Sequence, residues 1–326
     1  MKATGLSFVV PVRNDAERLR VSLASIVRSA RQADVPFEIL VADNGSADHS
    51  VLVAREAGAT VLELPDSKVS AMRNAAARRA RFELVAFVDA DNEIAPEWVA
   101  SMLEAFDDNT VGACGSPYSC PVGGTWVQRA YDLLRPKPSG SEDVEWLGSG
   151  NLAIRKKAFA AVNGFDATLT TCEDVDLCQR LIRQRIRLVS VAGMSSVHHG
   201  DPRTLKAVFM GELWRGRDNI RVTLREPSFR SLISLAISLL IAAGILAFFF
   251  GAWWSPWLSL LALLLVIGVI VLRAARMSAT PSRRRTVSFA RVLMVASAYE
   301  IGRALAIFAR LSHHRRHASP AVQAHV

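Results

Sequence analysis

The sequence predicts an α/β domain, built on a mostly parallel sheet with helices on both faces, followed by a C-terminal membrane hairpin. In the first half of the chain, short apolar runs alternate with segments of helical periodicity, the pattern of a sheet covered on both faces. Two long uncharged runs follow after residue 227. Charge is uneven as well, since residues 1–226 carry 28 Lys+Arg against 29 Asp+Glu, and residues 227–326 carry 11 against 1.

This charge distribution argues against a nucleic-acid partner and favours membrane lipid. The net charge is +9, but the basic excess lies entirely in the last hundred residues. A basic nucleic-acid binder should carry its excess on the folded domain. Because the basic segment is also apolar, a membrane surface is the expected partner.

The α/β domain is predicted from its apolar strands and the polar residues that end them. The expected strands are 6–12, 37–42, 60–64, 84–88 and 187–191. Three strand ends carry polar clusters, namely Arg13-Asn14-Asp15, Asp43-Asn44 and Asp89-Ala90-Asp91. Ligands bind beyond the carboxyl ends of the strands in such sheets, so we expect these clusters at one site.

The Asp89–Asp91 pair is predicted to hold a divalent cation, Mg²⁺ or Mn²⁺. Two carboxylates spaced i, i+2 at a strand exit suit a hard cation that keeps positions open for phosphate oxygens. A solvated loop is the alternative, and the two other acidic strand ends, at Asp15 and Asp43, argue against it.

Two further residues are predicted to contact a nucleotide. Asp43 can accept hydrogen bonds from a nucleobase or ribose, and helix capping by Asn44 or Ser46 is a compatible alternative. Arg73 lies on a predicted helix and could reach a diphosphate. The alternative for Arg73 is a solvated helix face.

In their order along the chain, these residues resemble family 2 of the glycosyltransferases, whose nucleotide-sugar-binding fold is called GT-A. The resemblance covers roughly residues 5–225. The matching stretches are Phe8–Asn14, Ile39–Ser46, Ala71–Asn74, Phe87–Asp91, Gly148–Arg155, Gly164–Asp166 and Cys172–Leu177.

The resemblance implies a role for each matching position. It implies that Asp91 ligates the metal directly, that Asp89 reaches the ribose or the metal, and that Asp174 is the catalytic base beside Glu173. It implies that Pro11, Val12 and Asp43 hold the nucleoside. Together with these, the predicted donor-binding residues are Arg13, Arg73, Asp89 and Ala90. Gly150 and Asn151 are expected to contact the acceptor or the diphosphate.

The chemistry of inverting transfer is consistent with two separate acid clusters. A carboxylate must remove the proton of the attacking acceptor hydroxyl, while a metal stabilises charge on the departing diphosphate. The alternative for Glu173 and Asp174 is the acidic first turn of a helix.

Two later segments, 198–199 and 212–217, each allow two roles. His198 and His199 follow a short strand, and the resemblance favours His198 as a further metal ligand over a simple loop pair. Processive synthases of the family carry Gln-x-x-Arg-Trp near residues 212–217, and this chain does not, which argues against a polymerase. Trp214 and Arg215 are expected to clamp the acceptor or the diphosphate, or else to form a basic collar at the membrane.

The C-terminal part predicts a membrane hairpin. The uncharged run 232–254 is long enough to cross a hydrocarbon core of about 30 Å, and 255–272 forms a second run. A basic loop follows the second run, and basic loops are retained on the cytoplasmic side. Because a hairpin crosses the membrane twice, the N-terminal domain is expected on the same side as this loop. A buried hairpin of a soluble protein is the alternative. The last apolar stretch, 287–311, favours an interfacial amphipathic helix over a third span.

The predicted domains are therefore 1–226, 227–272 and 273–326. The predicted function is an inverting glycosyltransferase, multi-pass in the bacterial inner membrane, with its catalytic domain in the cytoplasm. It would transfer a sugar from a nucleotide diphosphate sugar to a lipid-linked or membrane-associated acceptor in exopolysaccharide or cell-envelope glycan synthesis. No protein partner follows from the sequence.

Three alternatives remain. A polyprenyl-phosphate sugar synthase would use the lipid phosphate itself as acceptor. A sugar nucleotidyltransferase should show a Gly-rich basic loop after the first strand, where residues 13–17 contain no glycine. A catalytically inactive membrane scaffold would have lost its acid pairs, and both are present.

Overall fold

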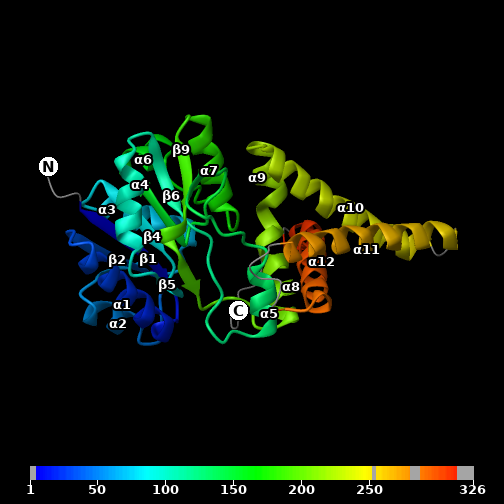
Figure 1. Cartoon of the computed structure of the whole chain (residues 1–326), viewed down its shortest axis with the longest axis horizontal. Coiled ribbons are helices and arrows are strands. Elements are labelled where there is room, and N and C mark those ends of the chain that lie inside the picture. Colours follow the sequence, from blue (N-terminus) through cyan, green and yellow to red (C-terminus); the bar gives the residue numbers. More distant parts are fainter. Residues whose placement is uncertain (1–4, 252–254, 280–286, 314–326) are drawn as a thin grey trace. The chain divides into compact units, whose positions relative to one another are not determined.

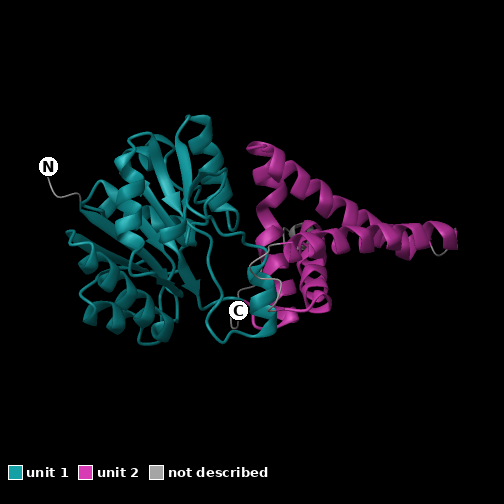
Figure 2. Cartoon of the chain, in the orientation of Figure 1, with its two compact units in different colours: residues 1–201 teal, residues 202–326 magenta. Residues whose placement is uncertain are grey.

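The structure is a computed structural model that describes residues 5–251, 255–279 and 287–313, with the side chains of 309–313 left out. The chain forms two compact units, Met1–Asp201 and Pro202–Val326 (Figure 2). The compact units divide at residue 201. The functional domain limits expected at residues 226 and 272 stay predictions. Part of the expected basic loop, Arg283–Arg285, lies outside the described residues, as does the chain after His313.

Unit 1 is built on an eight-stranded mixed sheet, which confirms the predicted fold class. The strand order is β3-β2-β1-β4-β8-β6-β9-β7. The strands are β1 (Leu6–Val12), β2 (Phe37–Asp43), β3 (Thr60–Glu63), β4 (Leu84–Val88), β6 (Val111–Gly115), β7 (Ser141–Asp143), β8 (Asn151–Arg155) and β9 (Arg187–Val191). All five predicted strands are present, with ends that differ by one residue at most.

Parallel pairing brings the predicted site residues to one edge. β1 pairs in parallel with β2 and with β4, and Val12 lies opposite Asp43. β8 runs antiparallel between β4 and β6, which the local sequence pattern does not reveal. The carboxyl ends of β1, β2 and β4 therefore meet at the same edge of the sheet.

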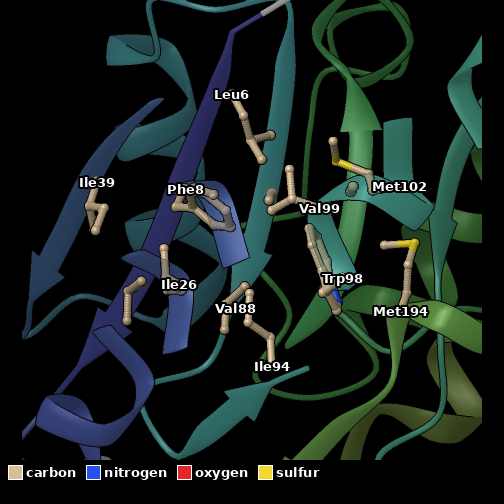
Figure 3. Close-up of a cluster of buried hydrophobic side chains, with 14 of the residues drawn as sticks. Leu6, Phe8, Ile26, Ile39, Val88, Ile94, Trp98, Val99, Met102 and Met194 are labelled. Carbon is tan, nitrogen blue, oxygen red and sulfur yellow. The ribbon is translucent and has the colours of Figure 1, made fainter. Parts of the chain in front are cut away.

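Helices cover both faces of this sheet (Figure 1). They are α1 (Ala16–Gln32), α2 (Ser50–Glu56), α3 (Val69–Arg79), α4 (Trp98–Asp107), α6 (Lys156–Ala161) and α7 (Glu173–Arg183). A further helix of unit 1, α5 (Trp126–Asp132), contributes no residue to the cores that flank the sheet. Alternate side chains of β1 belong to two different hydrophobic cores. Phe8 packs with Ile26 of α1 and Trp98 of α4 (Figure 3), whereas Val9 packs in a core with Met72 of α3.

A small second sheet follows the predicted metal-binding loop. β5 (Asn92–Ile94) pairs antiparallel with β10 (Ser196–His198), and His198 lies opposite Asn92. This pairing carries the predicted histidines, late in the sequence, back to the end of β4. The 3-10 turn η1 (Ala192–Met194) leads into β10.

Unit 2 is helical. It consists of α8 (Leu205–Arg215), the 3-10 turn η2 (Gly216–Asp218), α9 (Asn219–Arg225), α10 (Phe229–Gly251), α11 (Pro256–Ser278) and α12 (Phe289–His313). By length and composition, α10 and α11 could cross a membrane, with 23 residues each. Pro256 occupies the first turn of α11, where a proline needs no backbone hydrogen bond.

α12 spans most of the last predicted apolar stretch, and two of its charged residues bond to other helices of unit 2. Glu300 accepts a hydrogen bond of 2.5 Å from Arg273 of α11, and Arg303 donates one of 3.0 Å to Ser234 of α10. α12 also packs against α8. Glu300 and Arg303 are therefore bonded to neighbouring helices, while the placement of α12 at or across a membrane stays a prediction.

Candidate active site

One buried arginine joins the two predicted acid clusters. Arg73 projects from α3 with a side chain only 3% exposed. Its Nη2 donates to Asp89 Oδ1 at 2.6 Å and its Nη1 donates to Glu173 Oε1 at 2.9 Å. The alternative of a solvated helix face is therefore wrong for Arg73. Both carboxylates hold the guanidinium in place, so it can act on a donor only from this fixed position.

Glu173 and Asp174 begin α7 but lie in different environments. Glu173 accepts hydrogen bonds from Arg73 and, at 3.2 Å, from the Ser149 hydroxyl. Asp174 accepts one from the Val175 backbone N–H at 2.8 Å. Burial, and next the negative charge of Glu173, raise the pKa of the Asp174 carboxyl to about 7. A carboxylate with this pKa is well matched to accept a proton at neutral pH.

Trp146 lies next to this carboxylate and was not predicted from the sequence. Its side chain hydrogen-bonds Asp174, which by itself lowers the pKa of that carboxyl. Trp146 is also one of the exposed large apolar side chains, at 47%. Its position two residues before the Gly148–Arg155 stretch is the one sequence signal that could have pointed to it.

Asp89 is packed against Gly150, which explains that glycine. A Cβ on Gly150 would lie 2.0 Å from Asp89 Oδ2. The Gly150 backbone is also bonded, because its N–H donates to the Tyr118 hydroxyl and its carbonyl accepts from Asp89 N–H. Gly150 therefore lets the chain approach Asp89, and its predicted contact with the acceptor or diphosphate stays untested.

Asn151 has a role in the core in place of the predicted ligand contact. Its side chain is fully buried. Its Oδ1 accepts a hydrogen bond from the Trp98 indole at 2.7 Å, and its Nδ2 donates to the carbonyls of Ser116 and Met194. With its amide used in this way, Asn151 fixes the start of β8 and leaves no side-chain donor for an acceptor or diphosphate.

Asp91 and His198 form the pair best suited to a metal. His198 Nε2 lies 3.4 Å from Asp91 Oδ2, and burial raises the pKa of the Asp91 carboxyl. Neighbouring ligands of an octahedral ion, at about 2.1 Å from it, stand about 3.0 Å apart, so this pair fits a hard divalent cation. His199 differs, since its Nε2 lies 3.0 Å from Glu93 Oε2.

This site would depend on the substrate for its remaining ligands. No group of three or more His, Cys, Asp or Glu side chains able to hold a metal occurs among the described residues. Mg²⁺ is commonly held by one or two carboxylates together with substrate phosphates. Two protein ligands therefore leave positions for diphosphate oxygens.

Asp43 presents an unsatisfied acceptor at the predicted nucleoside site. Its side chain is buried, and Oδ2 accepts from the Ser46 backbone N–H at 2.9 Å. Oδ1 is buried with no partner among the described residues. A buried acceptor without a partner costs about 1–3 kcal/mol, so a bound N–H or O–H group would relieve that cost.

The capping alternative for Asn44 and Ser46 is wrong. α2 begins at Ser50, and His49 occupies its N-cap without a side-chain hydrogen bond. Asn44 instead accepts from the Ser67 N–H, and Ser46 Oγ accepts from the Asn14 N–H. These bonds fix the loops around Asp43.

The remaining predicted donor residues lie on the same edge of the sheet. Pro11 and Val12 are buried at the end of β1, and Arg13 follows them in an exposed position. Ala90 is buried between the two aspartates.

Trp214 and Arg215 belong to α8 of unit 2, where Arg215 pairs with Glu212 at 2.8 Å. Their expected contact with the acceptor or the diphosphate stays a prediction.

Comparison with known proteins identifies a group of similar sequences. The family model described as Glycosyl transferase family 2 matches residues 7–161. The pre-mycofactocin glycosyltransferase of Mycobacterium tuberculosis is 32% identical over 196 residues, which cover 56% of this chain and 40% of that protein. Chondroitin synthase of Escherichia coli is 34% identical over 242 residues, covering 61% and 35%. The chain thus spans less than half the length of these relatives.

A solved structure shares the fold. A mannosyltransferase from Pyrobaculum calidifontis, solved in complex with GDP-Man and Mn²⁺, superimposes with a TM-score of 0.53 at 16% identity. The match covers 91% of this chain and 86% of that one. At this identity the likeness concerns the fold.

Proposed function

Because the chain belongs to family 2 of the glycosyltransferases, we propose that unit 1 transfers one sugar from a nucleotide diphosphate sugar to a hydroxyl of a membrane-associated acceptor. The proposed reaction inverts the anomeric carbon and uses Mg²⁺ or Mn²⁺. One observation carries the proposal: Arg73 bonds both Asp89 and Glu173, so it joins the two acid clusters that metal binding and proton removal require.

Asp43 is the proposed anchor of the donor's nucleoside. Its buried Oδ1 lacks a partner among the described residues, and a ribose hydroxyl or nucleobase N–H would supply one. Pro11, Val12 and Arg13 end the neighbouring strand and would form the wall of this site. GDP-Man in the mannosyltransferase of similar fold supports a nucleotide-sugar donor.

Asp91 and His198 are the proposed metal ligands, with Asp89 beside them. A bound cation would neutralise charge on the diphosphate as the sugar leaves. The 3.4 Å separation of Asp91 Oδ2 and His198 Nε2 supports this assignment. Mn²⁺ in the same mannosyltransferase structure adds support for a divalent metal. Asp89, bonded to Arg73, would help hold the donor.

Asp174 is the proposed general base. The acceptor hydroxyl oxygen would form a bond to the anomeric carbon while its proton passes to the Asp174 carboxylate. The bond from that carbon to the diphosphate oxygen breaks, and the nucleoside diphosphate leaves with the electron pair. Glu173, paired with Arg73, would orient the start of α7. The raised pKa of Asp174 supports the assignment of the base to this residue.

The acceptor is proposed to be lipid-linked, in exopolysaccharide or cell-envelope glycan synthesis. α10 and α11 are long and apolar enough to span a membrane, and the C-terminal segment is basic. We place the enzyme in the bacterial inner membrane with unit 1 on the cytoplasmic side. Tethering the site there would concentrate it near lipid-linked substrates.

A donor screen tests this proposal. The full chain in detergent or nanodiscs is incubated with UDP-, GDP- and TDP-sugars, with Mn²⁺ or with EDTA, and release of the nucleoside diphosphate is measured. We expect release from one donor class, abolished by EDTA and by Asp91→Ala. Release of inorganic pyrophosphate from a nucleoside triphosphate and a sugar phosphate would instead identify a nucleotidyltransferase.

The same preparation distinguishes the lipid-phosphate alternative. A phosphate acceptor is already ionised at neutral pH and needs no general base, whereas a hydroxyl acceptor does. With membrane lipid extract as acceptor, loss of turnover in Asp174→Asn supports a hydroxyl acceptor. Retained turnover would point to a polyprenyl-phosphate sugar synthase.

A further inference from the structure

His198 lies between two carboxylates, and only one of them belongs to the proposed metal site. Its Nε2 faces Asp91 at 3.4 Å, and its Nδ1 lies 2.9 Å from Asp201 Oδ1. Because a carboxylate accepts hydrogen bonds, Asp201 favours the tautomer with hydrogen on Nδ1. That tautomer leaves the Nε2 lone pair free on the side of Asp91.

Asp201 is itself held rigidly. Its side chain is 2% exposed. Arg135 Nη1 donates to Asp201 Oδ1 at 3.0 Å, and Arg135 Nη2 donates to Asp201 Oδ2. Gln128 of α5 donates to the Asp201 backbone carbonyl at 3.1 Å. With both oxygens engaged in this way, Asp201 is suited to orient the imidazole and is poorly suited to ligate a metal itself.

The surroundings of His198 also restrict its ring. The Tyr118 ring lies 5.1 Å from the His198 ring, centroid to centroid. A Cβ on Gly200 would lie 1.9 Å from Asp91 Oδ2 and 3.1 Å from His198 Cε1, so the turn closes tightly around this pair. The imidazole is therefore fixed at one ring face and at Nδ1, which leaves Nε2 as the nitrogen available to a ligand.

We propose that Asp201, fixed by Arg135, is a positioning residue that directs His198 Nε2 toward the cation held by Asp91. The proposal rests on the metal site of the proposed function. Carboxylates that hydrogen-bond the second nitrogen of a metal-bound histidine fix its tautomer and orientation, and their loss typically costs about 10- to 100-fold in metal affinity.

A purely structural ion pair is the competing explanation. Asp201 and Arg135 would then only tie the end of unit 1 to the segment after α5. The two explanations differ in what they predict for metal binding. A structural pair would change stability alone, whereas a positioning residue acts on the metal only through His198.

Calorimetric titration separates them. Mn²⁺ is titrated into the full chain saturated with UDP or with GDP, for wild type, Asp201→Asn, His198→Ala and the double variant. We expect Asp201→Asn to weaken Mn²⁺ binding about 10- to 100-fold. Since Asp201 acts through His198, the double variant should bind no more weakly than His198→Ala alone.

Asp176→Asn is the matched control. Asp176 is fully buried and paired with Arg180 at 2.7 Å, as Asp201 is paired with Arg135, but it lies in α7. It should lose stability and keep its Mn²⁺ affinity. If Asp201→Asn does not fold, Arg135→Lys replaces it. A lysine contacts the carboxylate through one ammonium, so a smaller loss of Mn²⁺ affinity is expected.

The outcomes distinguish this inference from the proposed function. If His198→Ala weakens Mn²⁺ binding and Asp201→Asn or Arg135→Lys leaves it at the wild-type value, the positioning role is overturned and the metal site stands. Additive losses in the double variant would also overturn it. If wild type binds no Mn²⁺ with either nucleotide, the metal site of the proposed function fails, and the inference fails with it.

Discussion

Arg73→Met tests the arginine that joins the two acid clusters. The substitution keeps an unbranched apolar stem but removes the guanidinium that pairs with Asp89 at 2.6 Å and with Glu173 at 2.9 Å. Removing one partner of a buried ion pair costs about 3–5 kcal/mol. Asp89 is 29% exposed and Glu173 13%, so water relieves part of this cost and we expect about 3 kcal/mol.

Thermal unfolding of the full chain measures this cost. In a unit of the size of Met1–Asp201, each 1 kcal/mol shifts Tm by about 2–4 °C, so we expect the unit 1 transition to fall by about 6–12 °C. The variant Arg73→Met/Asp89→Asn/Glu173→Gln leaves no unpaired buried charge and should recover much of the loss. A shift below about 2 °C in Arg73→Met would refute the view that the ion pairs of Arg73 with Asp89 and Glu173 hold the two acid clusters together.

Three further predictions concern the metal, the glycine beside Asp89 and the topology. Asp91→Ala should abolish transfer and the metal-dependent part of donor binding while unit 1 stays folded, as measured by calorimetry and circular dichroism; full activity in EDTA would contradict the metal assignment. Gly150→Ala should lower stability by about 1–3 kcal/mol, because its Cβ would lie 2.0 Å from Asp89 Oδ2, whereas Gly140→Ala, with nothing within 4 Å of its Cβ, should not. In intact cells, a membrane-impermeant thiol reagent should label a cysteine at Ser255 and not one at Ser282, and the reverse pattern would overturn the orientation.

The fold of unit 1 was predictable where it depends on local pattern. The run Leu6–Val12 is apolar at every position except Ser7, and in the structure it is a buried strand with the same bounds. Parallel register then brings its end beside Asp43. The antiparallel insertion of β8 between β4 and β6 was not predictable in this way. It pairs Val88 with Asn151 and Cys114 with Ala153, residues far apart in the chain, and no local periodicity records such partners.

The site was predictable by residue type but not by partner. A polar residue in a motif looks the same in sequence whether it faces a ligand or the core, which is why Asn151 was expected to contact substrate and instead bonds Trp98. Arg73 was left between two interpretations because its partner Glu173 lies 100 residues further along the chain. Asp201 was missed although it follows His198 by three residues, since its other partner, Arg135, is 66 residues away.

Turnover of Asp174→Asn, compared with Glu173→Gln, tests the central claim most directly. The claim is that Asp174 removes the acceptor proton, so Asp174→Asn should lose about 10²- to 10⁴-fold in kcat with donor affinity unchanged, and Glu173→Gln should lose less.

The pH profile adds a second reading of the same experiment. An Asp174 whose pKa is raised to about 7 is protonated below that pH and cannot accept a proton. The kcat of wild type should therefore fall as the pH drops below about 7, and this acid limb should be missing in Asp174→Asn. Wild-type turnover in Asp174→Asn together with an inactive Glu173→Gln would contradict the account and assign the base to Glu173.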